Sequence, residues 1–126
     1  MVCLDTSTII EVLCDNKMVV DAIMGHSAGE RISTTAITEY ELLKYAGKKR
    51  VDAMRRLLET MVVHGFDRAA AMESSAIFGR LEAKGTPIDD SDIMIAGVAA
   101  SRGELLITMD KDFSKLGSDM VLVLEK

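Results

Sequence analysis

The sequence predicts an α/β fold in which a mostly parallel sheet is covered by helices on both faces. Short apolar runs alternate along the chain with longer segments of helical periodicity, and this alternation is typical of parallel sheets. The run Leu105–Ile107 is uninterrupted by polar residues, as expected of a strand that is buried on both faces. With 126 residues, 48% of them hydrophobic, the chain is expected to form one domain over residues 1–126 with its own core.

The expected elements follow one another in the order strand, helices, strand, helices, strand, helix, helix, strand, strand. The strands are expected at residues 1–4, 62–66, 105–107 and 120–124, and residues 29–33 are expected to form a turn and a short second strand. The helices are expected at residues 9–13, 19–25, 37–47, 51–61, 68–84 and 93–101, with a short one at 113–116.

Hydroxyl and carboxyl side chains indicate where several helices begin. The hydroxyls at residues 6–8 offer N-caps to the first helix, and Thr34 or Thr35 can cap the third. Asp67 is the expected N-cap of the long helix, and Asp112 that of the short helix before the last strand. Each cap follows an expected strand or turn, which supports the alternating pattern.

Glycines and one proline indicate where helices end. Gly25, Gly47 and Gly85 each follow a stretch of helical periodicity. Gly103 stands where a helix C-cap favours a left-handed residue, and Pro87 breaks the chain before the next helix.

The balance of charge limits the possible partners. Twenty acidic against 15 basic residues give a net charge of −5, which disfavours binding long nucleic acid by bulk electrostatics but allows a local site.

No apolar run approaches the ~20 residues that span a bilayer, and no basic leader precedes Asp5, so we expect a cytoplasmic protein without membrane contact. Cys3 and Cys14 lack Cys-x-x-Cys spacing and are expected to be reduced core residues rather than a disulfide or zinc pair.

Four carboxylates share one place in the predicted topology. Asp5 follows the first strand, Glu39 is early in the helix after the second, Asp92 opens a helix, and Asp110 follows the strand at Leu105. In a parallel sheet all four can reach the same edge, where open α/β sheets bind ligands. Because clustered carboxylates repel one another, the arrangement favours a hard cation such as Mg²⁺ or Mn²⁺. Such an ion activates water and stabilises the charge that develops on a phosphodiester.

Other polar side chains lie beside these carboxylates in the sequence. Thr6, Ser7 and Thr108 could bind a metal-bound water or a phosphate oxygen, and Asp90 could support the site or cap its helix. Glu41, two positions after Glu39, is expected to face another side of the helix, in solvent or behind the metal ligands.

Four short motifs contain these residues. They are Leu4-Asp5-Thr6-Ser7, Glu39-x-Glu41-Leu42, Asp92-Ile-Met-Ile-Ala96 and Thr108-Met-Asp110-Lys-Asp112-Phe113. Together they resemble the PIN-domain nucleases, and most closely the small stand-alone VapC-type toxins. The resemblance covers essentially the whole chain, with the motifs in the family's order and spacing.

The resemblance implies a three-layer α/β/α sandwich with a five-stranded parallel sheet. It implies cleavage of RNA with Mg²⁺ or Mn²⁺, in which Asp5, Glu39, Asp92 and Asp110 bind the metal and Thr108 lines the site. It also implies a homodimer and an antitoxin protein whose tail blocks the site.

The basic residues allow two interpretations. Lys48, Lys49 and Arg50 are candidates for contacts with the RNA backbone, together with Lys44, Arg55 and Arg56 nearby. The alternative is a solvated pair of helices without a ligand.

Two other functions are compatible with the pattern, and two more are disfavoured. One is a PIN-type nuclease of RNA maturation or turnover without an antitoxin, and another is a catalytically silent protein-binding domain. An aspartyl-phosphate phosphohydrolase would need a second acid two residues after Asp5, where the chain has Ser7. A dinucleotide-binding fold is disfavoured because no Gly-x-Gly-x-x-Gly follows the first strand.

Overall fold

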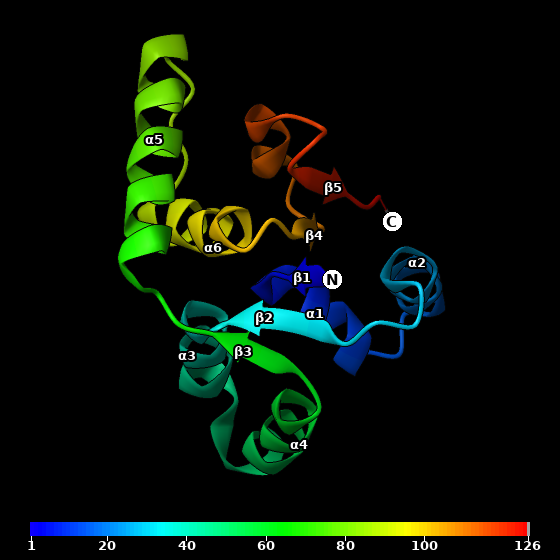
Figure 1. The fold of residues 1–126 in the computed structure, drawn as a ribbon. Coiled ribbons are helices and arrows are strands. Elements are labelled where there is room, and N and C mark those ends of the chain that lie inside the picture. Colours follow the sequence, from blue (N-terminus) through cyan, green and yellow to red (C-terminus); the bar gives the residue numbers. More distant parts are fainter. Residues whose placement is uncertain (126) are drawn as a thin grey trace.

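A five-stranded sheet forms the centre of the computed structural model, which describes residues 1–125 (Figure 1). The strand order is β3-β2-β1-β4-β5, and every neighbouring pair is parallel. The predicted parallel sheet is therefore confirmed. The strands are β1 Val2–Leu4, β2 Ile32–Thr35, β3 Val62–His64, β4 Leu105–Thr108 and β5 Val121–Val123.

Helices cover both faces of this sheet. The α-helices are α1 Thr6–Leu13, α2 Lys17–Ser27, α3 Ala36–Tyr45, α4 Gly47–Glu59, α5 Arg68–Lys84 and α6 Asp90–Ser101, and a 3₁₀ helix, η1, spans Lys111–Leu116. Because strand residues alternate between faces, Val2 and Leu4 pack with α1, α2 and α4, whereas Cys3 packs with α5 and α6. Figure 1 shows α5 and α6 against one another beside the sheet. The three-layer arrangement expected from the resemblance is confirmed.

The helix caps agree with the sequence at three positions and differ at two. Thr35 caps α3, Asp67 caps α5, and Gly85 ends α5 in the left-handed conformation, all as predicted. Asp5 rather than a hydroxyl residue caps α1, since its carboxylate accepts from the Thr8 amide. Likewise Asp110 rather than Asp112 caps the 3₁₀ helix.

Several element boundaries also differ from those predicted. The second strand covers Ile32–Thr35, whereas the sequence predicts a turn and a short strand within residues 29–33, so the strand continues two residues further than expected. Helix α2 continues past Gly25 to Ser27 and ends at Ala28, which adopts the left-handed conformation with φ at 52°. Helix α4 begins at Gly47, directly after α3.

The sheet reverses its winding direction between β1 and β4. The chain passes from β1 to β2 and β3 on one side, and later adds β4 and β5 on the other. Such a switch point leaves a crevice at the carboxyl ends of the two central strands. Asp5 follows β1 and Thr108 ends β4 at this point, so the topology brings together residues that are far apart in the sequence.

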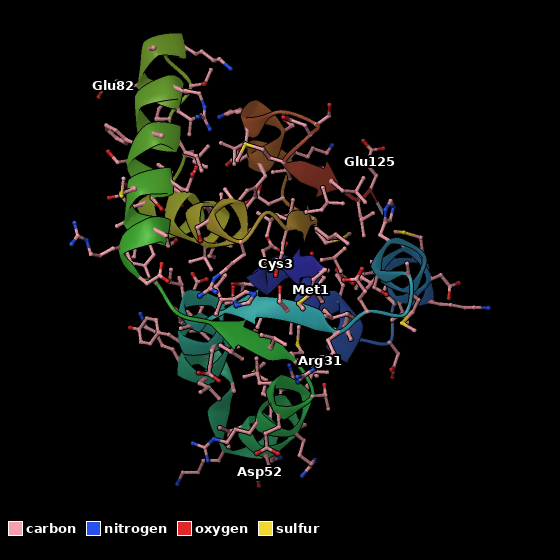
Figure 2. The ribbon with its side chains drawn as sticks, viewed as in Figure 1. Met1, Cys3, Arg31, Asp52, Glu82 and Glu125 are labelled. Atoms are coloured by element: carbon pink, nitrogen blue, oxygen red, sulfur yellow. The ribbon has the colours of Figure 1, made fainter. Side chains whose placement is uncertain are left out.

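The two cysteines have different environments. Cys3 lies at the centre of the molecule in Figure 2, and burial raises the pKa of its thiol to about 12. Cys14 is exposed at the end of α1, which corrects the expectation of two core cysteines. Both thiols are free, as expected.

Within residues 1–125, the helices are too short or too polar to cross a bilayer.

A polar contact ties three strands together on the face that α5 and α6 cover. Glu104, just before β4, accepts a hydrogen bond from Ser33 of β2 and lies 3.0 Å from His64 Nε2 of β3. Because both partners are largely removed from water, an unpaired carboxylate here would be costly. His64 is thereby committed to a structural contact.

Helices α5 and α6 approach closely at Gly97. A Cβ atom added at this position would lie 1.9 Å from Ser74 Oγ and 2.9 Å from the Ala70 carbonyl oxygen. Only a residue without a side chain fits this distance. The glycine therefore permits the contact between the two helices, although it lowers the helix propensity of α6.

We expect Gly97→Ala to lower the free energy of unfolding by about 1–3 kcal/mol, because the added methyl overpacks this contact. Gly79→Ala on α5 is the matched control: no atom lies within 4 Å of its added Cβ, so helix propensity should raise stability by up to about 1 kcal/mol. Urea unfolding of both variants measures the difference. Equal stability of Gly97→Ala and the wild type would contradict the close approach.

Candidate functional site

Asp5 is the most enclosed carboxylate at the switch point. It is 3% exposed, at the carboxyl end of β1 and the beginning of α1. Its two oxygens accept hydrogen bonds from Ser7 Oγ at 2.9 and 3.0 Å, from the Thr8 amide at 3.0 Å and from Thr8 Oγ1 at 2.9 Å. Thr108 Oγ1, from the neighbouring strand β4, donates to Asp5 Oδ2 at 2.5 Å.

Main-chain amides fix the direction of two of these hydroxyls. Met109 N donates to Ser7 Oγ at 3.1 Å, and Asp110 N donates to Thr108 Oγ1 at 3.0 Å. A hydroxyl that accepts from an amide is left to donate its own proton, here to Asp5. These donors favour the ionised carboxylate, but burial has the larger effect and raises the pKa of Asp5 above its ordinary value.

Asp92 lies in the first turn of α6 and is partly buried. Burial raises the pKa of Asp92 to about 6, and the negative charges of Asp110, Asp89, Asp5 and Glu41 contribute to the shift. Asp5 and Asp110 are linked through Thr108, whose hydroxyl donates to Asp5 Oδ2 and accepts from the Asp110 amide. Because charge interactions decay with distance, the contributions of Asp5 and Asp110 to the pKa of Asp92 agree with a position of Asp92 near this pair.

The structure places Glu41, and not the predicted Glu39, beside Thr6 of α1. Glu41 Oε1 accepts a hydrogen bond from Thr6 Oγ1 of α1 at 2.6 Å, which holds its carboxylate beside the cluster. Glu39, two residues earlier, lines a different groove with Arg55 and Glu59 of α4. Two positions on a helix point about 160° apart, so both side chains cannot reach one site.

The other polar residues predicted at the site differ in whether they contact the carboxylates. Thr6, Ser7 and Thr108 all bond a carboxylate of the cluster. Asp90 is exposed in the first turn of α6 without a side-chain capping bond at that helix. Asp110 accepts from the Asp112 amide at 2.9 Å through one oxygen, so its second oxygen remains for another contact.

The basic candidates lie on α4. Lys48, Lys49 and Arg50 are exposed in its first turn. Arg50 lines a groove of about 440 Å³ together with Thr6 and Glu41, which connects it to the acid cluster. The sequence alone gave no reason to separate Arg50 from its two lysine neighbours.

The donor atoms of the cluster suit a hard cation. Asp5, Glu41, Asp92 and Asp110 offer only oxygen, and none of the ion pairs within residues 1–125 neutralises any of them. In that same part of the chain, no three acidic, histidine or cysteine side chains converge closely enough to hold an ion by themselves.

Comparison with known proteins shows a common family. The family model for the PIN domain matches residues 2–118. The tRNA(fMet)-specific endonuclease VapC of Salmonella typhimurium is 32% identical over 93 residues, which cover 68% of this chain and 70% of that protein.

Solved structures with the same fold cover nearly the entire chain. The DNA-bound VapBC from Salmonella typhimurium gives a TM-score of 0.83 at 26% identity and covers 98% of both chains. VapBC-5 from Mycobacterium tuberculosis, a member of the VapBC family of toxin–antitoxin systems, gives 0.70 at 29% identity over 99% of this chain and 98% of that one.

The raised pKa of Asp92 predicts how stability depends on pH. The folded value of about 6 exceeds the ordinary value of 3.8, so the folded state binds the proton more tightly and stability falls as pH rises between the two values. In EDTA, Asp92→Asn should lose less stability than the wild type between pH 4 and pH 7, and should be the more stable protein at pH 7.

Urea unfolding at several pH values measures this effect. Asp52→Asn, which removes an exposed carboxylate from α4, controls for the change in net charge (Figure 2). Parallel pH profiles for the wild type and Asp92→Asn would contradict the repulsion within the cluster.

Proposed function

The chain belongs to the PIN-domain family, and on this premise we propose that it is a metal-dependent endoribonuclease, the toxin of a VapC-type toxin–antitoxin pair. The observation that carries the proposal is the group of Asp5, Glu41, Asp92 and Asp110 at the switch point, held without a neutralising cation among residues 1–125. The relative from Salmonella typhimurium is an endonuclease specific for a tRNA.

The four carboxylates would hold Mg²⁺ or Mn²⁺ at this edge of the sheet. When bound, such an ion supplies a water nucleophile and stabilises the negative charge that develops on the phosphodiester. Asp5 is oriented for this role from both sides, by Thr8 and Ser7 of α1 and by Thr108 of β4.

Glu41 and Asp92 complete the arrangement from two other helices. Thr6 aims Glu41 from α1, and Asp92 projects from the first turn of α6. Each carboxylate is thus fixed by a different element, so the geometry depends on the packing of the whole domain and not on one loop.

A protein partner belongs to the proposal. The solved relatives from Salmonella typhimurium and Mycobacterium tuberculosis are VapBC proteins. We extend this pairing to the present chain, for which an antitoxin would block access of RNA to the acid cluster. A homodimer remains a prediction from the resemblance, and a nuclease of RNA maturation without an antitoxin is the alternative that retains the same site.

Glu41→Gln should reduce RNA cleavage by at least about a hundredfold. Removing a side chain that binds the metal lowers activity more than removing a side chain that only supports a metal ligand. Glu39→Gln is the matched control and should keep wild-type activity, since its side chain lies in the other groove. Cleavage of a mixed RNA pool by purified protein with Mn²⁺, and with EDTA, measures both. The reverse ranking of the two variants would overturn the assignment of Glu41.

Asp92→Asn should abolish cleavage while the domain stays folded. The substitution removes a partly buried charge and relieves repulsion within the cluster, so we expect the variant to stay folded, which its urea unfolding checks. Calorimetric titration with Mn²⁺ should give a binding signal with the wild type that is lost in the variant. Full activity of Asp92→Asn would refute the proposed site.

A further inference from the structure

Helix α3 exposes both tyrosines of the chain. Tyr40 is 62% exposed and Tyr45 79% exposed, although aromatic side chains of this size usually contribute to a core or an interface. Their helix is otherwise anchored by buried Thr38 and Leu42 on its inner side. The rings are therefore available for a partner outside the domain.

A lysine lies between the two rings. Lys44 Nζ is 5.6 Å from the centroid of Tyr40 and 5.2 Å from that of Tyr45. The Tyr45 hydroxyl beside it raises the pKa of Lys44, so the ammonium stays charged. Cation–π attraction holds the three side chains as a group, which we call the α3 platform: Tyr40, Lys44 and Tyr45.

The α3 platform adjoins the acid cluster. Tyr45 stands one helical turn after Glu41, and residues at this spacing are neighbours on the helix surface. Tyr45, Glu41 and Thr6 line the same groove of about 440 Å³, with Arg50 of α4 also at its wall. A chain that enters the groove toward the cluster therefore passes the exposed ring.

The local charge complements a polyanion. The protein carries a net charge of −5 and its acid cluster repels phosphate, so a nucleic acid needs nearby cations to approach. Arg50 supplies a positive charge at the wall of the groove, and Lys44 supplies a second one beside Tyr45, whose side chain lines the groove. Proteins that bind single-stranded RNA combine such cations with aromatic rings on which unpaired bases stack.

We propose that the α3 platform binds the RNA substrate next to the scissile bond, with an unpaired base stacked on Tyr45 and the adjoining phosphate near Lys44. The substrate is then a single-stranded segment or loop, since a base inside a duplex cannot reach the ring. This inference rests on the proposed ribonuclease function and adds the side chains of α3 that hold the RNA beside the acid cluster.

The test measures binding separately from cleavage. In EDTA, with Asp92→Asn as the common background, fluorescence anisotropy would compare a labelled hairpin that has an unpaired loop with a fully paired duplex of matched length. Tyr45→Ala should weaken hairpin binding by about tenfold or more and leave duplex binding unchanged. Tyr45→Phe keeps the ring and should stay within about twofold of the parent.

Two further variants separate stacking from charge and from general truncation. Lys44→Gln should lower the slope of log affinity against log salt by about 0.7, the value for one phosphate contact on a single strand. Phe78→Ala removes an exposed ring from α5 and should leave hairpin binding unchanged.

The outcomes distinguish this inference from the proposed function. Unchanged hairpin binding by Tyr45→Ala, or an equal loss on the duplex, would overturn the platform. If Tyr45→Ala instead altered only self-association or antitoxin binding, the surface would be a protein interface and the inference would be wrong. Equal KM values for RNA cleavage by the wild type and by Tyr45→Ala would refute the platform alone. A wild-type protein that neither binds nor cleaves RNA would refute both the platform and the proposed ribonuclease function.

Discussion

The structure depends on the buried carboxylate of Asp5. One side chain begins α1, links β1 to β4 through Thr108, and contributes the central charge of the acid cluster. Burial alone would drive this group to its neutral form, and the hydroxyl and amide donors around it act in the opposite direction. The same hydrogen bonds that make the first helix stable therefore also prepare the charge on which the chemistry depends.

The cluster also shows a conflict between stability and function. Asp92, Asp110 and Glu41 add negative charge near Asp5 although no cation within residues 1–125 pairs with them. A domain selected only for stability would neutralise or separate these groups. Their retention at the topological switch point agrees with a site whose counter-charge arrives with a ligand.

Much of the fold was predictable from the sequence because alternating apolar runs and helix caps are local signals. The parallel sheet and the caps at Thr35, Asp67 and Gly85 follow from them. The rotational phase of α3 was not predictable, because apolar side chains occur on several of its sides and Leu42 and Ile37 pack into different clusters.

That phase determines whether Glu39 or Glu41 reaches the crevice, because a difference of two residues moves a side chain to the other side of the helix. The partner hydroxyl of Glu41, Thr6, lies 35 residues away in the chain and gives no local signal. The α3 platform was missed for a similar reason, since the exposure of Tyr40 and Tyr45 depends on how α3 packs. Asp5, Asp92 and Asp110 stand out in the sequence because each lies near the end of a strand or at the start of a helix, and their role in metal binding stays a prediction.

The central position of β1 affects when the acid cluster can form during translation. Strand β1 is synthesised before its neighbour β4, and the Thr108 hydroxyl of β4 follows 103 residues after Asp5. Chains are synthesised at about 5–20 residues per second, so several seconds pass before that hydrogen bond can form. A nascent or prematurely released chain that lacks β4 also lacks the assembled acid cluster. For a protein whose activity would harm the cell that makes it, translation itself thus delays the appearance of the site until the domain is nearly complete.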